Sequence, residues 1–159
     1  MDPVSILSIV TATSNLVCKC GSVIQTLHDL AHRYKQAEVS ILSIIQECQT
    51  IELAWSRIEQ WAENGLNDYE DYDQLSNRLQ NSLYSGQLVM AELEKDLFAI
   101  QEAPQHSRFR RKTKIIWNER LLHDHQDRIR GQVCAMMLLL EVIHLLVSNS
   151  IAKLFPHIV

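Results

Sequence analysis

Two histidines with an acid beside them form the pattern closest to a metal site. His28 and His32 stand one helical turn apart, and Asp29 follows the first. On one helix face, both imidazoles can chelate a metal ion and the neighbouring acid can serve as a base. A catalytic zinc site also needs a third ligand and an open position, and its motif carries glutamate where Asp29 reaches one methylene less. We expect solvated histidines and no metal. A metal-dependent hydrolase is the enzymatic alternative.

Other residues with reactive side chains do not converge on one point. His123 and His125 flank Asp124, but residues two apart on a helix point to different faces. Cys18 and Cys20 diverge for the same reason, and small buried thiols pack like apolar side chains. The sequence has no serine in a nucleophile elbow, no glycine-rich phosphate loop and no evident pair of carboxylates. It predicts no enzymatic activity, no catalytic residues and no cofactor.

A basic segment is the strongest charge cluster. It holds five cationic residues in seven positions: Arg108, Arg110, Arg111, Lys112 and Lys114. The segment has one aromatic residue, Phe109, and the whole chain is acidic, so we predict no nucleic-acid partner. Each basic residue close to an anionic membrane contributes about 1 kcal/mol. We therefore predict that this segment contacts anionic phospholipid or an acidic partner.

The N-terminal segment is more apolar than a solvated helix requires. Five large aliphatic residues occupy seven positions: Val4, Ile6, Leu7, Ile9 and Val10. No charged residue occurs between Asp2 and Lys19, a run of 16 residues. This run is slightly shorter than the roughly 20 residues that span a bilayer as a helix. The five aliphatic residues are candidates for shallow membrane insertion, with association with other helices or burial in a core as the alternatives.

The composition favours helices. The chain has 159 residues, 47% of them hydrophobic, and only 4 glycines and 3 prolines, the residues on which the turns of a β-protein depend. A chain of this length can bury a core without disulfide bonds, so we predict one all-α domain over residues 1–159. Its four cysteines are scattered, and the N-terminus has no basic leader. Both features predict a reducing, cytoplasmic location.

Charge is segregated along the chain. Residues 38–102 carry a net charge of −10, and residues 103–130 carry a net charge of +5. The two segments are therefore expected to attract each other or to meet a charged partner.

Hydrophobic spacing predicts four long helices, over residues 3–34, 36–64, 73–102 and 114–150. Pro3 suits a first helical position, and Pro104 stops the third helix because its ring cannot continue the hydrogen-bond ladder. Short connections favour an antiparallel four-helix bundle. We assign four residues to its structural seam: Trp55, Trp117, Asn118 and His125. Asn118 and His125 are expected to form polar layers that hold the helices in register.

Each predicted helix carries an apolar stripe. The first is Ile6, Ile9, Val17, Cys20, Ile24, Leu27, Ala31 and Tyr34, with Thr13 in the seam and Gly21 as a point of bending or breakage. The second is Ile41, Ile44, Cys48, Ile51, Trp55, Ile58 and Ala62. The third is Leu75, Leu79, Leu83, Gly86, Met90, Leu93, Leu97 and Ile100. The last is Ile115, Leu122, Ile129, Val133, Met136, Leu140, Ile143 and Val147. Steps of three and four are typical of a packed bundle.

Short motifs resemble a known family. They are Asp-Pro-Val-Ser-Ile-Leu at 2–7, Glu-Cys-Gln-Thr at 47–50, Trp-Asn-Glu at 117–119, Arg-Gly-Gln at 130–132 and Leu-Leu-Leu at 138–140. In this order they look like the N-terminal domain of fungal STAND and ankyrin-repeat proteins, a HeLo-like helical bundle. The match spreads over nearly the whole chain, and the third predicted helix contributes only its heptad pattern.

The resemblance implies a domain at the front of an NLR-like receptor in programmed cell death, innate immunity or heterokaryon incompatibility. The implied mechanism is oligomerisation triggered by the receptor, followed by release of the apolar N-terminal helix to damage the plasma membrane. On this chain, residues 3–17 would insert, and the basic segment would aid the approach to lipid. The implied partners are a second copy, anionic lipids and other signalling proteins or receptor modules. The protein would move from the cytoplasm to the plasma membrane on activation.

A second hypothesis keeps the first helix permanently buried. The chain is then an interaction or oligomerisation module of such a receptor and binds a helix through an exposed seam, without membrane activity.

Overall fold

The computed structural model describes four stretches of the chain, residues 3–33, 38–65, 72–101 and 119–154. Each is one α-helix: α1 (Pro3–Arg33), α2 (Glu38–Gly65), α3 (Tyr72–Gln101) and α5 (Glu119–Leu154). The described residues contain no β-strand. This confirms the prediction of an all-α protein.

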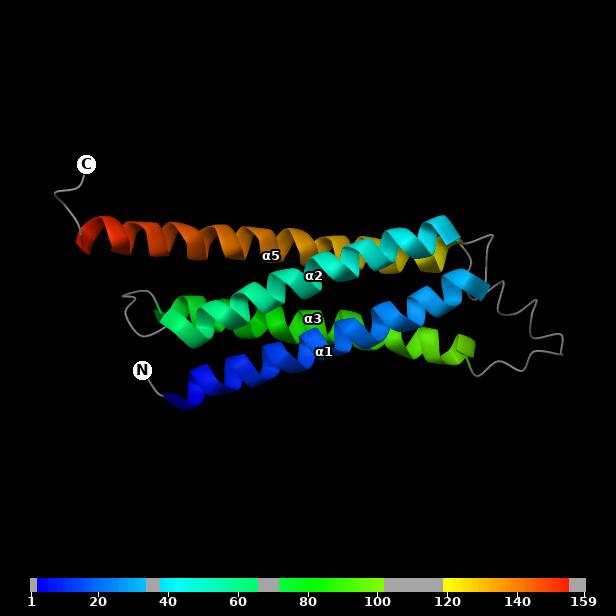
Figure 1. Cartoon of the computed structure of the whole chain (residues 1–159), viewed down its shortest axis with the longest axis horizontal. Helices are drawn as coiled ribbons and strands as arrows, with labels where there is room; N and C mark the ends of the chain where they lie inside the picture. Colours follow the sequence, from blue (N-terminus) through cyan, green and yellow to red (C-terminus); the bar gives the residue numbers. More distant parts are fainter. Residues whose placement is uncertain (1–2, 34–37, 66–71, 102–118, 155–159) are drawn as a thin grey trace.

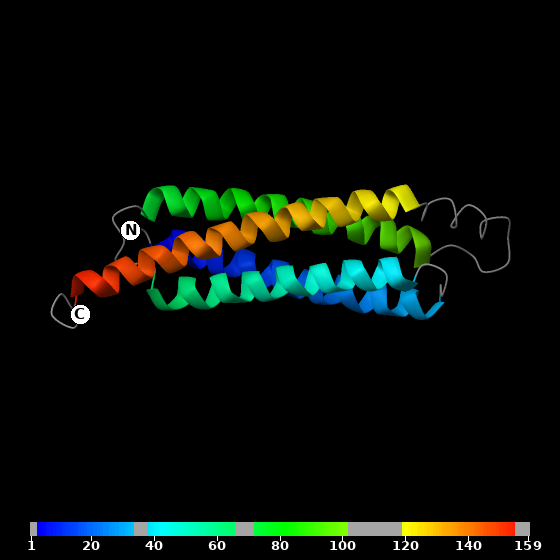
Figure 2. The same cartoon turned by 90° about the horizontal axis from the view of Figure 1, so that it is seen from above.

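All four helices lie along the long axis of the molecule (Figure 1). The sequence colours run from left to right along α1 and α3, and from right to left along α2 and α5. Seen from above, α5 crosses the space between α2 and α3, with α1 behind it (Figure 2). Both α1 and α5 pack against α2 and α3, and the pair of α1 and α2 is the most extensive. Each helix therefore has two neighbours, and α1 lies opposite α5.

The helix ends differ from the predicted ends by a few residues. α1 passes through Gly21 without a break. α5 continues one turn beyond the predicted end at residue 150, to Leu154. The sequence Ile-Ala-Lys-Leu at 151–154 contains no helix breaker, and Pro156 is the first residue that cannot continue the helix. The predicted start of this helix, at residues 114–118, lies outside the described residues.

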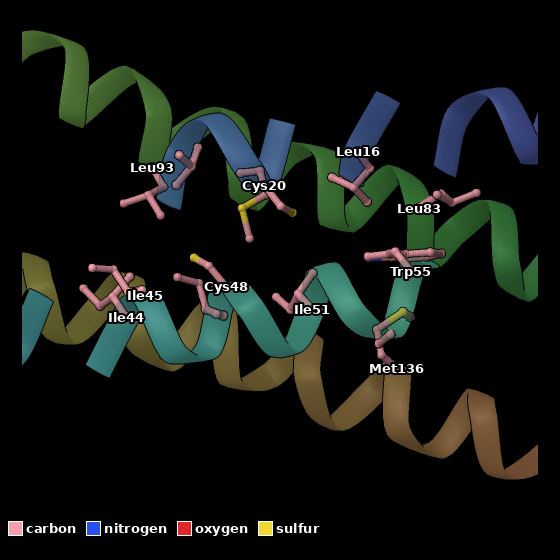
Figure 3. Close-up of a cluster of buried hydrophobic side chains, with 14 of the residues drawn as sticks. Leu16, Cys20, Ile44, Ile45, Cys48, Ile51, Trp55, Leu83, Leu93 and Met136 are labelled. Carbon is pink, nitrogen blue, oxygen red and sulfur yellow. The ribbon is translucent and has the colours of Figure 1, made fainter. Parts of the chain in front are cut away.

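The core is built from one buried stripe on each helix, and Figure 3 shows labelled side chains from all four helices within it. On α2 all seven predicted positions are buried, as are all eight on α3. On α5 four predicted positions are buried, Leu122, Ile129, Met136 and Ile143, while Val133 and Leu140 are partly buried. The spacing of three and four therefore identified the inward face of these helices correctly.

The buried stripe of α1 differs from the predicted stripe. Leu16 and Val23 are fully buried, whereas Val17 and Ile24 are partly buried at the edge of the core. The buried residues of α1 are Ile9, Thr13, Leu16, Cys20, Val23, Leu27, Leu30 and Ala31. Leu16 and Val17 are both apolar, as are Val23 and Ile24, so spacing alone permits two stripes on α1. The placement of α2 and α3 decides between them.

Candidate functional site

The outer face of α1 is polar but uncharged over its first half. The exposed residues between Leu7 and Lys19 are Leu7, Ser8, Thr11, Asn15 and Cys18. Hydroxyl and amide groups give this face hydrogen bonds to water without the charge that an outward helix face normally carries. Within the described part of α1, the first charged residue is Lys19. α1 therefore presents an apolar core face and an uncharged outer face.

The predicted membrane-insertion residues lie on different faces of α1. Leu7 is 68% exposed, Val10 is partly buried against the core, and Ile9 is fully buried. Val4 and Ile6 belong to α1, but their side chains lie outside the described ones. Leu7 is thus available without any rearrangement, whereas Ile9 can reach a membrane only if α1 leaves the bundle.

The length and composition of α1 are compatible with a membrane. Among the described residues, the segment Leu7–Arg33 is long and apolar enough to cross a bilayer. Only 28% of its most apolar stretch is buried in the bundle. The core helix of a soluble protein passes the same test, so this property fits both membrane engagement and permanent burial.

Polar contacts tie the middle of α1 to its neighbours. The Lys19 ammonium donates to the Glu94 carboxylate of α3 over 2.8 Å. The Ser14 hydroxyl donates to the Glu59 carboxylate of α2. These contacts are partly exposed, and exposed ion pairs contribute only about 0–1 kcal/mol. The buried apolar stripe, rather than the polar contacts, therefore provides most of the energy that holds α1.

Two buried thiols lie in the core between α1 and α2 (Figure 3). Burial raises the pKa of the Cys20 thiol to about 12, with a smaller effect of the Glu52 charge. Burial likewise raises the pKa of the Cys48 thiol to about 12, and Cys20 and Glu47 add to the shift. Because the thiolate is the reactive form, both side chains are protected from thiol reagents while α1 stays in place.

The raised thiol pKa values predict a loss of stability at alkaline pH. Each pKa rises from 9.0 in the unfolded chain to about 12 in the fold, so the thiols ionise first in the unfolded state. Their contribution to the free energy of unfolding is complete below pH 9.0 and is lost as the pH rises towards about 12. We expect the urea midpoint to fall more steeply with pH in the parent protein than in a Cys20→Ala, Cys48→Ala variant. The matched control replaces the exposed Cys18 and Cys134, and an equal slope in both variants would contradict the prediction.

Acidic residues of α2 and α3 meet basic residues of α5. The Arg130 guanidinium donates to Glu47 on α2 over 2.7 Å. The Arg128 guanidinium donates to Glu92 on α3 over 3.3 Å. The attraction expected between the acidic and basic segments therefore operates within the bundle.

His125 is a buried polar residue at the junction of α3 and α5. It is 3% exposed, and its Nε2 lies 2.8 Å from the Asp96 carboxylate. Its Nδ1 has no hydrogen-bond partner among the described residues. Trp55, also assigned to the structural seam, is completely buried. The other two seam residues, Trp117 and Asn118, lie outside the described residues.

The histidine pattern on α1 lies at the surface. His28, Asp29 and His32 are all exposed. In the described part of the chain, no group of three or more histidine, cysteine, aspartate or glutamate side chains is placed to hold a metal ion. His32 and Arg33 occupy the last turn of α1, where a positive charge interacts favourably with the helix dipole.

The predicted lipid-binding segment lies outside the described residues. It comprises Arg108, Arg110, Arg111, Lys112 and Lys114. Its contact with lipid or an acidic partner stays a prediction.

Polar links between helices were not predicted from the sequence. The Gln126 amide donates to the Ser43 hydroxyl over 2.6 Å and joins α5 to α2. The Gln132 amide donates to the Ser85 hydroxyl over 2.6 Å and joins α5 to α3. The sequence gives one indication of these links: Gln126 and Gln132 each lie three residues from Ile129, at the edge of the buried stripe of α5. Their partners cannot be read from the sequence, because they depend on which helices lie on each side.

Comparison with known protein families, curated proteins and solved structures finds no match to this chain. The resemblance drawn from the short motifs therefore stays a prediction.

Proposed function

We propose that this chain is a non-enzymatic signalling or effector domain that self-associates and engages anionic membranes through α1. In this proposal the four helices form an antiparallel bundle of the HeLo-like type, and the domain moves from the cytoplasm to the plasma membrane when activated. The observation that carries the proposal is the pairing of a buried apolar stripe with an uncharged outer face on α1. Such a helix exposes no charge to lipid over its first half.

The energy of α1 burial accounts for a stable resting state. α1 buries five large aliphatic side chains: Ile9, Leu16, Val23, Leu27 and Leu30. Each contributes about 1.5–3 kcal/mol relative to exposure to water. Release of α1 into water is therefore strongly unfavourable. Release into the acyl region of a membrane avoids this cost, because the same side chains then lie in an apolar environment instead of water.

The first test is leakage of a fluorescent dye from vesicles of anionic phospholipid, using a Leu7→Glu variant. Leu7 is 68% exposed, so the substitution leaves the core intact. An acidic side chain costs about 2.5–3.5 kcal/mol at the centre of a membrane helix and less towards its ends, so a carboxylate at position 7 should weaken insertion of the apolar run. We expect the parent protein to release dye and Leu7→Glu to release little, while circular dichroism reports equal helix content.

The matched control is Leu53→Glu on α2, where the parent leucine is 60% exposed. This variant gains the same charge outside α1, so we expect leakage equal to that of the parent. Equal leakage from Leu7→Glu and the parent would contradict a role for the outer face of α1. Leakage lost in both variants would indicate a general effect of charge.

Thiol modification provides a direct reading of α1 release. Cys20 is completely buried, whereas Cys18 on the same helix is exposed. We expect a maleimide to modify Cys18 at once, and to modify Cys20 only when vesicles are added. Mass spectrometry of the labelled peptides distinguishes the two sites. Protection of Cys20 during leakage would mean that α1 stays in the bundle.

The alternative is an interaction module of a larger receptor, in which α1 never leaves. The extensive packing of α1 on α2 and its fully buried stripe favour this possibility. A monodisperse, folded protein that releases no dye, even when fused to an oligomerising partner, would support the interaction module. Partners would then be other signalling proteins or modules of the receptor itself.

A further inference from the structure

The outer face of α5 changes its chemistry at Gly131. Before this point the exposed residues are polar, and most are charged: Arg120, His123, Asp124, Asp127, Arg128 and Arg130. After it they are mainly apolar: Cys134, Ala135, Met137, Leu138, Val142 and Leu145. The sequence from 131 to 150 contains one charged residue, Glu141. An exposed apolar face on one half of a helix is typical of a binding surface.

The apolar residues follow a second heptad stripe. Gly131, Ala135, Leu138, Val142 and Leu145 are separated by steps of four and three and are all exposed, and we call them the outer seam. Leu138 is 70% exposed, and Leu145 is 53% exposed. The core stripe of α5, with Ile129 and Met136, is buried within the bundle. α5 thus has two seams, and the other three helices cover only one of them.

Gly131 makes no close packing contact with the described residues. It lies inside a continuous helix, where glycine is less stable than alanine because it loses more backbone freedom on folding. A Cβ atom built at Gly131 meets no atom within 4 Å. At Gly86, by contrast, a Cβ atom would lie 3.1 Å from Leu16. The space above Gly131 is therefore open to a side chain from another molecule.

We infer that the outer seam binds the outer seam of a second copy, with the two α5 helices antiparallel. The seam has small residues at one end and large residues at the other. Antiparallel pairing sets the small end of each copy against the large end of its partner. In a heptad layering, Gly131 then faces the Val142 position of the second copy, and Ala135 faces the Leu138 position. Parallel pairing would crowd the large ends and leave the small ends apart.

The order of small and large residues along the outer seam complements itself in an antiparallel pair, so it favours a second copy as the occupant. The chain carries a net charge of −4, so two copies repel each other over much of their surface. The outer seam contains no charged residue, and in this layering Leu145 faces the position of Arg128 in the second copy, where Arg128 pairs with Glu92 of its own chain. The interface of a single helix pair is smaller than the standard interface of about 800 Å² per partner. We therefore expect a weak dimer that dissociates on dilution. The inference rests on the self-association in the proposed function and names the surface that performs it.

Sedimentation equilibrium of the full chain tests the interface with a Leu138→Glu variant. This change places two carboxylates close to the two-fold axis, and we expect the dimer Kd to rise by at least about 100-fold. Leu138 is exposed, so the helical content should not change. Leu53→Glu carries the same charge on α2 and should dimerise like the parent.

A size exchange tests the pairing of small and large residues. Gly131→Leu has room within the fold, so it should fold normally but weaken the dimer about tenfold or more. Adding Val142→Ala to Gly131→Leu restores a small residue opposite a large one and should recover most of the affinity. An unchanged Kd in Gly131→Leu, or no recovery in the double variant, would overturn the proposed register.

Disulfide cross-linking tests the orientation, with the exposed Cys18 and Cys134 replaced by serine. In an antiparallel pair, the cysteines of Leu138→Cys lie about 5 Å apart along the helix axis, while those of Leu145→Cys lie about 26 Å apart. We expect cross-linking at 138 and none at 145. Cross-linking at both positions would indicate a parallel pair and overturn the inference.

The outcomes separate this inference from the proposed function. A parent protein that self-associates while Leu138→Glu does so equally well would exclude the outer seam and leave self-association intact. A parent that stays monomeric at all concentrations would overturn the inference. Binding of this monomer to anionic vesicles through Leu138 would assign the seam to lipid instead. Dye release by Leu7→Glu and its control reports on α1 independently of all these results.

Discussion

Replacing Trp55 with alanine should lower the free energy of unfolding by about 3–5 kcal/mol. The Trp55 side chain is completely buried on α2 and belongs to the core cluster that also contains Leu83 and Met136 (Figure 3). The substitution removes the largest fully buried side chain and leaves a cavity that the surrounding helices can close only in part. Urea unfolding followed by far-ultraviolet circular dichroism measures the loss.

Two further variants make the Trp55 prediction specific. Leu53→Ala removes an exposed side chain from the same helix and should change stability by no more than about 0.5 kcal/mol. Trp55→Phe keeps an aromatic ring and removes an indole N–H that has no hydrogen-bond partner among the described residues, so its loss should be smaller than that of alanine. A loss below about 1 kcal/mol for Trp55→Ala would contradict the placement of Trp55 in the core.

Replacing Gly86 with leucine should push α1 away from α3. A Cβ atom at Gly86 would lie 3.1 Å from Cδ2 of Leu16 and 3.6 Å from Nε1 of Trp55. A larger side chain must displace Leu16, and overpacking of this kind typically costs about 1–3 kcal/mol. Because the displaced residue belongs to α1, we expect faster maleimide modification of Cys20. Under the proposed function, we also expect more dye release at equal protein concentration.

Gly131→Leu is the matched control for Gly86→Leu. Gly131 has open space around it, so the leucine should stabilise the monomer by about 0.5–1 kcal/mol through helix propensity alone. Cys20 should stay protected in this variant. Equal stability changes at the two glycines would mean that the close approach of α1 to α3 does not matter. Destabilisation by Gly86→Leu with Cys20 still protected would place the opened contact elsewhere than at α1.

The two glycines have different structural roles, although both lie inside helices. Gly86 is buried where α3 approaches α1, and any side chain there would separate the helices. Gly131 is exposed, and a Cβ atom added there meets no described atom within 4 Å. Under the two proposals above, the first glycine serves the resting bundle and the second serves pairing between copies. Release of α1 and pairing of α5 would thus use opposite sides of the molecule, since α1 and α5 are not neighbours.

Some expectations from the sequence succeeded because they depend on local chemistry. The stripe of α2 from Ile41 to Ala62 runs in unbroken steps of three and four, so it marked the inward face correctly, although Leu42 and Leu53 are apolar and exposed. The stripe of α1 had two solutions, because Leu16 and Val17 are both apolar. Burial of Leu16 depends on where α2 and α3 lie, and that information is not in the helix itself. The end of α5 was misplaced because Ser-Asn-Ser at 148–150 is polar without being a helix breaker.

The sequence by itself determined the helical class, the inward faces of α2 and α3, and the uncharged run of α1. These properties follow from the spacing of apolar residues and the scarcity of glycine and proline, which act within a few residues along the chain. The tertiary structure decided that Leu7 is exposed and Ile9 is buried, and that Cys20 is protected in the core. It also decided that the outer seam of α5 has no partner within the described helices. These properties depend on which helices become neighbours, because the same apolar stripe is core or surface according to what covers it.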